Sequence, residues 1–196
     1  MIEIKHSWMW LTKLMSKKEK RIEIIDTNVP MTAGNRVADI PDDLLLCAKA
    51  CIEFIQELIK KDSGVRVVLD SNHLVLNEYE KNIKSLRGED NLATYFLHWI
   101  YEYLAKIQPD DFFPLTELSE NEYAEYPNHI SELKSFDPSD KKFIALAFVH
   151  KESPVIIEAT DSKWWGIKDI LKDEGIEVMF LCEEYIKEKF EKKIDK

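Results

Sequence analysis

The chain of 196 residues contains no long apolar run. Its longest apolar stretches, such as residues 143–149, are far shorter than the roughly 20 residues that a membrane-spanning helix needs. The N-terminus shows no clean apolar stretch followed by a small-residue cleavage site, so we expect no secretory signal, no membrane contact and a cytoplasmic location. Internal repeats and low-complexity tracts are also absent from the sequence.

Cysteine is scarce. Cys47, Cys51 and Cys182 form an odd set without a CxxC pair, so we expect neither a disulfide framework nor a zinc site. Cys47 and Cys51 stand one helical turn apart, and we expect both in the core.

The residues that are present suit a folded domain. Hydrophobic residues make up 45% of the chain and charged residues 33%, enough apolar side chains to build a core. The length fits one domain of ordinary size, and disorder is excluded as an overall description. We expect a domain over residues 21–196, preceded by an extension over residues 1–20 that contains Trp8 and Trp10.

The formal net charge of −10 is unexpected for a protein that binds nucleic acid, because acidic surfaces repel phosphate. Most of this charge is regional, since residues 107–140 contain nine acidic residues and one basic residue. This segment is either a solvated loop or an element that shields a site or docks a basic partner. A basic cluster before the first strand can contact a polyanion, although a solvated linker is the favoured interpretation; it consists of Lys13, Lys17, Lys18, Lys20 and Arg21.

The order of predicted elements favours an α/β fold. Residues 26–28 are expected to turn, a loop to run through Gly34, and the segment between Pro109 and Pro138 to be a loop with at most one short helix. We therefore predict a three-layer α/β/α sandwich with a mainly parallel central sheet of about four to five strands. The predicted strands are 21–25, 65–69, 155–159 and 176–181, and the predicted helices are 41–63, 72–86, 91–108, one after Pro138, 163–172 and a last one to the C-terminus.

Carboxylates follow two of these strands. In an open parallel sheet, ligands bind beyond the carboxyl ends of the strands, which is where Asp26 and Asp161 are expected. Asp140 lies in the first turn of a helix, and Glu78 flanks the apolar stripe of another. These four residues are the candidate site.

Each candidate also has a structural interpretation. Asp26 and Asp161 fit turn or N-cap positions equally well, because Asp accepts hydrogen bonds from free helix N–H groups. Asp137 fits an N-cap better than a site, with Pro138 and Asp140 following it at the first and third helical positions. A lone Glu78 is more often a surface glutamate than a ligand.

Read together, four local strings resemble the motifs of PIN-domain nucleases, in the family's order and over roughly residues 21–181. IIDTNVPMTAGN resembles a hydrophobic strand followed by Asp, a hydroxyl residue and Asn. VVLDSNHLVLNEYEKNI resembles the second motif, a strand and turn before a helix that contains Glu-Tyr. DPSDKKFIALA resembles the third, in which Ala follows Asp, and VIIEATDSKWW resembles the fourth, in which a strand delivers Thr-x-Asp or a close variant.

Two departures from the family pattern are visible. Many members carry a second acidic residue two positions after the fourth-motif Asp, where this chain has Lys163. The acidic pair often found in the third motif is split here, since Ser139 directly precedes Asp140. The first departure puts an additional ligand at this end of the site in doubt.

The resemblance implies a site for Mg²⁺ or Mn²⁺, because clustered carboxylates repel one another without a cation. Asp26 and Asp161 would bind the metal directly, and Asp140 directly or through water. Glu78 would position a water or a second metal. The supporting and phosphate-contacting residues would be Thr27, Asn28, Thr160 and Asp137.

The same resemblance implies a metal-dependent endonuclease that hydrolyses phosphodiester bonds, with RNA favoured over DNA. Such enzymes often act as toxins held by an antitoxin or as defence effectors, and a homodimer is one arrangement open to them. The alternative is a PIN-like scaffold that binds a protein partner without cutting. A haloacid-dehalogenase phosphatase would need Asp where Asn28 stands, and a toprim nuclease would need Asp-x-Asp where Asp161 and Lys163 stand.

Overall fold

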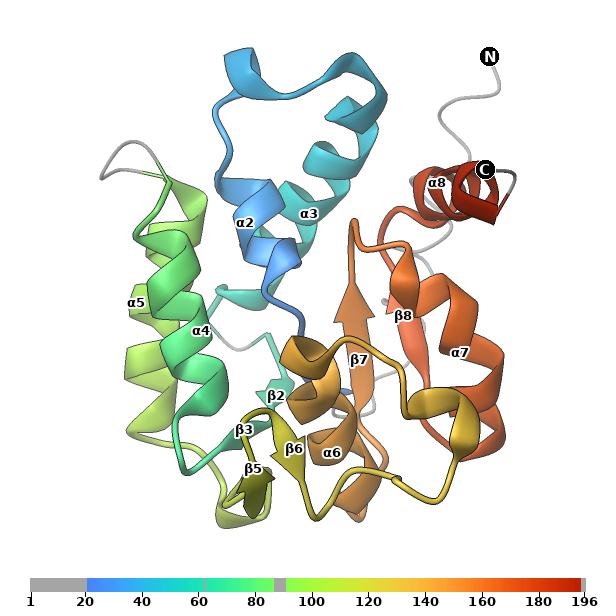
Figure 1. Ribbon diagram of the computed structural model, residues 1–196. Helices are drawn as coiled ribbons and strands as arrows, with labels where there is room; N and C mark the ends of the chain where they lie inside the picture. The colour runs from blue at the N-terminus through green and yellow to red at the C-terminus, as the bar shows by residue number, and fades with distance from the viewer. Residues whose placement is uncertain (1–20, 62, 87–90, 195–196) are drawn as a thin grey trace.

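A computed structural model describes residues 21–61, 63–86 and 91–194. It has the predicted architecture, a parallel four-stranded sheet flanked by helices (Figure 1). The sheet has the strand order β2-β1-β7-β8. Its strands are β1 (Arg21–Ile25), β2 (Val65–Val67), β7 (Val155–Glu158) and β8 (Val178–Phe180), and the helices are α2 (Asn28–Gly34), α3 (Leu45–Leu58), α4 (Leu74–Ile83), α5 (Leu92–Leu104), α6 (Lys141–Val149), α7 (Lys163–Asp173) and α8 (Glu183–Ile194).

The two central strands, β1 and β7, are rich in Ile and Val because helices cover both of their faces, although β1 also contains Arg21 and Glu23. They pair in parallel, with Ile24 beside Ile156 and Ile25 beside Ile157. Parallel pairing brings the C-terminal ends of both strands to the same edge of the sheet. Asp26, directly after β1, and Glu158, the last residue of β7, lie at this edge.

The helices predicted from apolar periodicity are confirmed, with ends that differ by a few residues. The predicted 41–63 helix begins with a 3-10 turn, Asp42–Leu44, and Gly64 follows it with a φ of 71°. Asn91 caps α5, since its side chain accepts a hydrogen bond from the Thr94 N–H at 3.0 Å.

The loop expected through Gly34 is wrong, because residues Asn28–Gly34 form the short helix α2. Pro30 lies in the first turn, where its missing N–H costs no helical hydrogen bond. At the other end, a Cβ added to Gly34 would come within 2.6 Å of the Ala93 Cβ, so α2 approaches α5 closely. Tertiary packing therefore stabilises a helix too short to show a periodic pattern.

The long loop expected between Pro109 and Pro138 is also wrong in detail. It contains the short strands β4 (Phe112–Phe113), β5 (Glu117–Ser119) and β6 (Glu122–Tyr123) and the 3-10 turns Pro109–Asp111 and Ser131–Leu133. β4 pairs in parallel with β3 (Leu69–Asp70), so the strand predicted over 65–69 is shared between two sheets. Strands of two or three residues are too short for alternation to indicate them.

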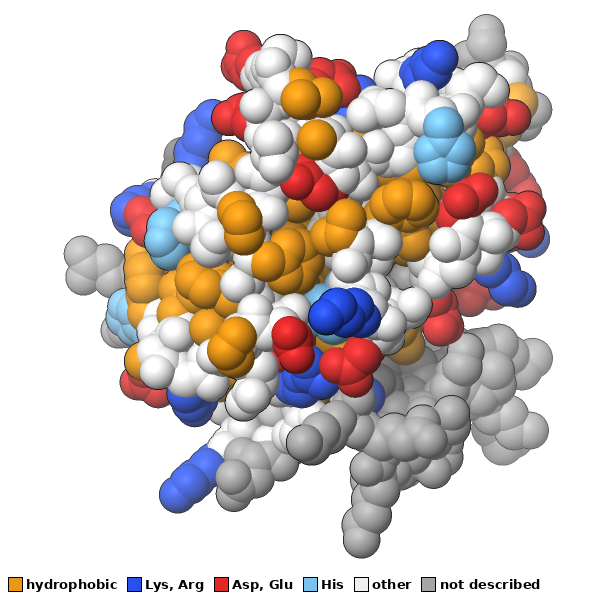
Figure 2. Space-filling view, turned by 90° about the horizontal axis from the view of Figure 1, so that it is seen from below, with side chains coloured by type: hydrophobic (Ala, Val, Ile, Leu, Met, Phe, Trp, Pro, Cys, Tyr) orange, Lys and Arg blue, Asp and Glu red, His pale blue; other side chains and the backbone are white. Residues whose placement is uncertain are grey.

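The edge opposite the C-terminal strand ends carries hydrophobic side chains on its surface (Figure 2). Figure 2 shows this face from below, with hydrophobic side chains gathered across it and charged side chains between and around them. The C-terminal end of α6 lies toward this face, and Phe148 and Val149, the last two residues of α6, are each 39% exposed.

Several predictions fall on residues outside the described part of the chain. These are the 1–20 extension, its Trp8 and Trp10, and the lysines of the basic cluster. Within the described residues, no helix is both long enough and apolar enough to cross a bilayer.

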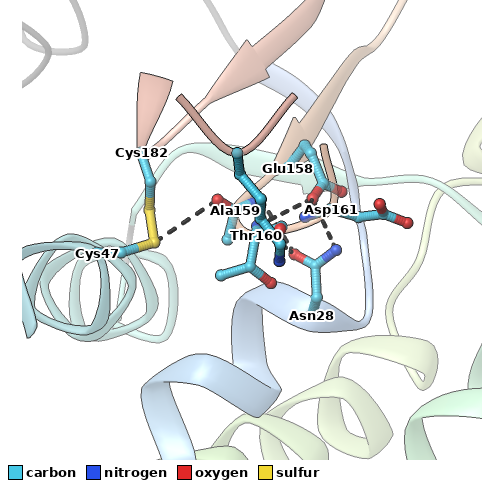
Figure 3. The surroundings of a disulfide bond; sticks show 8 residues. Asn28, Cys47, Glu158, Ala159, Thr160, Asp161 and Cys182 are labelled. Carbon is cyan, nitrogen blue, oxygen red and sulfur yellow. Dashed lines mark hydrogen bonds between the residues drawn. A yellow bond between two sulfur atoms is a disulfide. The ribbon is translucent and has the colours of Figure 1, made fainter. Parts of the chain in front are cut away.

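The cysteine prediction needs a correction. Cys47 on α3 and Cys182, just before α8, form a disulfide with a Cα–Cα distance of 5.1 Å (Figure 3). The two are 135 residues apart, so their spacing gives no local signal of pairing. The expected core position of Cys47 and Cys51 is confirmed, and Cys51 remains a buried free thiol. The three sulfur atoms lie within 4.8 Å of one another, but two of them are used by the disulfide and cannot act as thiolate ligands.

We expect reduction of this disulfide to destabilise the protein by about 2–4 kcal/mol, because the cross-link restricts the unfolded chain over a long loop. Urea denaturation with and without dithiothreitol measures the difference. A Cys47→Ala/Cys182→Ala variant is the control and should not respond to the reductant. Equal midpoints for the wild-type protein in both buffers would contradict a stabilising disulfide.

Candidate functional site

Asp26 is placed by the end of β1. Its N–H donates to the Ile157 carbonyl at 3.0 Å, which continues the pairing with β7 by one residue. One carboxylate oxygen accepts from the Asn28 N–H at 2.9 Å, so the turn interpretation of Asp26 is confirmed. The side chain is only 4% exposed, which is unusual for a carboxylate whose sole function is to stabilise a turn.

Asp161 lies three residues after β7 and is half-buried. Its Oδ1 accepts from the Lys163 N–H at 3.0 Å, so it also caps the start of α7. The Lys163 ammonium lies 3.8 Å from Oδ2. Lys163, which stands where many PIN-domain nucleases have an acidic residue, therefore partly neutralises Asp161.

Glu78 and Asp140 come from helices. Glu78, on α4, accepts a hydrogen bond from the Thr27 hydroxyl at 2.5 Å and pairs with the Lys142 ammonium. Asp140 ends the 3-10 turn Pro138–Asp140 and stands at the N-cap position of α6. Its side chain makes no capping hydrogen bond in α6, so capping does not explain its position.

The four predicted carboxylates line one open cleft of about 330 Å³ at the C-terminal edge of the sheet. Among the described residues, no three carboxylates bring oxygen atoms within 4.8 Å of one another, so the cluster is looser than a closed metal site. The lining consists of Asp26, Glu78, Asp140 and Asp161 with Thr27, Asn28, Met31, Asn82, Thr160 and Lys189.

Asp137 is the predicted residue that does not line this cleft. It is the N-cap of the Pro138–Asp140 turn, where its side chain accepts from the Ser139 N–H at 3.1 Å. It also pairs with Lys163, which lowers its pKa. The capping interpretation of Asp137 is therefore confirmed.

Sequence reasoning missed three charged residues at this edge. Glu158 is the last residue of β7 and is fully buried, and its signal was an acidic side chain in an otherwise apolar strand. Lys142 is buried beside Glu78, although a lysine after a helix start normally points to solvent. Lys189, on α8, reaches back to the Thr160 carbonyl at 3.0 Å, and nothing in its local sequence indicates this.

Asn28 and Glu158 join the ends of the two central strands (Figure 3). The Asn28 side-chain amide donates to Glu158 Oε1 at 2.7 Å, and its carbonyl oxygen accepts from the Ala159 N–H at 3.0 Å. The Cys47 sulfur lies 3.6 Å from the Ala159 carbonyl on the other side of this turn. The turn that presents Asp161 is thus held from two sides.

Burial and mutual repulsion shift the carboxylates toward their neutral forms. Burial, then the charges of Glu158 and Asp140, raise the pKa of Asp26 well above its usual value. Burial, then Asp137 and Asp161, raise the pKa of Asp140 to about 7. Burial also raises the pKa of Glu158 to about 8.

Lys142 supplies part of the missing positive charge. Its ammonium contacts Glu78 and the Ser139 carbonyl, and it opposes the rise in the pKa of Asp140. Lys163 and Lys189 supply two further ammonium groups at this edge, and the acidic groups still outnumber these three. The arrangement therefore favours binding of a further cation.

No family model, curated protein or solved structure matches this chain. The interpretation of the cleft therefore depends on its own chemistry. The four carboxylates that line the cleft can offer only oxygen atoms to a metal ion. Oxygen ligands suit hard divalent cations such as Mg²⁺ and Mn²⁺.

We expect the metal-free protein to lose stability as the pH rises from about 4 to about 8. The pKa values of Asp140 and Glu158 are about 7 and about 8 in the folded protein, against 3.8 and 4.5 as ordinary values. The folded state therefore holds more protons than the unfolded chain in this range, and raising the pH favours unfolding. Urea denaturation in EDTA at several pH values measures the effect.

Asp140→Asn removes one of these titrating groups. At pH 8 in EDTA, we expect it to increase the free energy of unfolding by about 1–2 kcal/mol after allowance for solvent screening. The gain should disappear below about pH 3, where Asp140 is mostly protonated in both the folded and the unfolded state. The control is Asp169→Asn, at a carboxylate that is 82% exposed on α7. Equal effects of the two substitutions would contradict the assignment.

Proposed function

We propose that this protein is a metal-dependent endonuclease that hydrolyses phosphodiester bonds, most readily in RNA. One observation carries the proposal: carboxylates from four separate segments of the chain line one cleft at the C-terminal edge of a parallel sheet. Ligand sites of open α/β sheets lie at this edge. The order of the motifs and their resemblance to PIN-domain nucleases support the same reading.

The residues present fit a divalent cation. Asp26, Asp161 and Asp140 would hold it, directly or through water, since their carboxylates line the cleft. Glu78 already binds Thr27 and Lys142, which suits it to orienting water. When bound, the cation would lower the pKa of a water molecule and offset the negative charge that develops on the phosphate.

The other residues have separable roles in this proposal. Asn28 keeps the ends of β1 and β7 in register through its bonds to Glu158 and Ala159. Asp140 would complete the cation site, directly or through water, from the first turn before α6. Lys189, at the wall of the cleft, is suited to contact a substrate phosphate.

A regulated role as a toxin or defence effector in the cytoplasm, with an antitoxin-like protein partner, belongs to the same proposal and depends on the resemblance. The acidic 107–140 segment ends at Asp140, a residue of the cleft itself. A basic partner that binds this segment would be placed to control access to the site.

The direct test is cleavage of mixed RNA and single-stranded DNA by the purified protein in Mg²⁺, Mn²⁺ or EDTA. Asp26→Asn and Asp161→Asn should each lower the rate by at least about 100-fold, because each removes a charged ligand from the site. Asp169→Asn, an exposed carboxylate of α7, should retain full activity. Cleavage that persists in EDTA or in both site variants would rule out this mechanism.

Substrate binding has a separate test. Lys189→Gln should increase KM for RNA about 3- to 10-fold with little change in kcat, because a phosphate contact binds substrate and transition state alike. The matched control is Lys187→Gln, an exposed lysine of the same helix. An unchanged KM for Lys189→Gln would place the substrate elsewhere.

The alternative function is a PIN-like scaffold that binds a protein partner without cutting. The hydrophobic side chains on the face opposite the cleft edge favour it, since exposed apolar patches often mark contact surfaces (Figure 2). Folded protein that binds no metal and cuts no nucleic acid would support the scaffold over the nuclease.

A further inference from the structure

Glu158 is a buried acid that none of the sequence motifs assigns to the site. It ends β7 after three apolar residues, and none of its surface is exposed to solvent. Acidic side chains are almost never fully buried without a partner of opposite charge. Among the described residues, neither Glu158 nor Asp26 forms an ion pair with a lysine, arginine or histidine.

The register of the sheet places Glu158 beside Asp26. Ile25 pairs with Ile157, and the Asp26 N–H donates to the Ile157 carbonyl at 3.0 Å, so Asp26 and Glu158 are the next residues along the two strands. Register partners in parallel strands direct their side chains to the same face of the sheet. The two acids therefore lie side by side at the C-terminal edge, where Asp26 lines the cleft and Glu158 is fully buried and not part of its lining.

The two oxygens of Glu158 have different surroundings. Oε1 accepts three hydrogen bonds, from the Asn28 amide at 2.7 Å and from the N–H groups of Thr160 at 3.1 Å and Asp161 at 2.8 Å (Figure 3). Oε2 is buried and has no hydrogen-bond partner. A buried acceptor without a donor costs free energy, so this oxygen indicates a missing partner.

We propose that Glu158 Oε2 and the Asp26 carboxylate form the inner pair of the divalent-cation site, with Asp161 and Asp140 nearer its open side. This inference rests on the proposed function for the identity of the ion, Mg²⁺ or Mn²⁺. The cation supplies the positive partner that both buried acids lack. Oε1 meanwhile keeps its three donors, so the ligand is held in position before the ion binds.

A matched pair of substitutions separates ligation from packing. Glu158→Gln preserves the shape of the side chain and an acceptor for the three donors, but replaces a charged ligand oxygen. Glu23→Gln is the control: Glu23 is also buried, also has an unpartnered Oε2, and lies on β1. It stands three residues before Asp26, so its side chain faces the other side of the sheet.

The measurement is Mn²⁺ binding to the full chain, followed by electron paramagnetic resonance of the free ion. We expect Glu158→Gln to weaken binding at least tenfold and Glu23→Gln to leave it unchanged. Circular dichroism checks the fold of each variant. If Glu158→Gln does not fold, Glu158→Asp replaces it: the shorter side chain keeps the charge but withdraws the ligand oxygen, so binding should still weaken at least tenfold, and unchanged binding would contradict the role of Glu158.

The outcomes distinguish this inference from the proposed function. Equal Mn²⁺ affinity of the wild-type protein and Glu158→Gln would overturn the role of Glu158 and leave the nuclease proposal intact. No binding by the wild-type protein would overturn the cation site. Selective loss in Glu158→Gln without any nucleic-acid cleavage would support the cation site and contradict the nuclease proposal.

Discussion

Electrostatic repulsion among carboxylates at one edge of the sheet is the constraint on which the rest of the site depends. The parallel pairing of β1 and β7 brings Asp26 and Glu158 together, and helices α4 and α6 add Glu78 and Asp140. Burial raises the free energy of these charges further, because little water reaches them. The polar contacts around them, from Thr27, Asn28 and Lys142, offset this repulsion only in part.

The parts of the fold that could be predicted are those with a long repeating pattern. Apolar periodicity indicated α3 and α5, and short runs rich in Ile and Val indicated β1 and β7. The position of a residue directly after such a strand was enough to place Asp26 at the C-terminal edge. Asp161, three residues beyond the end of β7, could be placed near the same edge by its position after that strand, so the general location of the site follows from local patterns.

The remaining features depend on contacts between distant segments. Helix α2 forms where Gly34 lets it approach Ala93, and the short strands β3 and β4 exist only as a pair. The sequence of β7 shows only that one acidic residue, Glu158, follows three apolar ones. Its role depends on Asp26, which lies beside it on the neighbouring strand. Lys189 reaches the cleft through the packing of a helix far along the chain, which no local pattern records.

The disulfide between Cys47 and Cys182 has a topological consequence for the cleft. The covalent ring that it closes contains Glu78, Asp140 and Asp161, whereas Asp26 lies outside it on the N-terminal side. A protease that cuts one exposed loop within this ring leaves both fragments covalently joined. The oxidised protein can thus be nicked there and still keep its cleft residues in a single molecule, while reduction would leave only noncovalent packing to hold the pieces together.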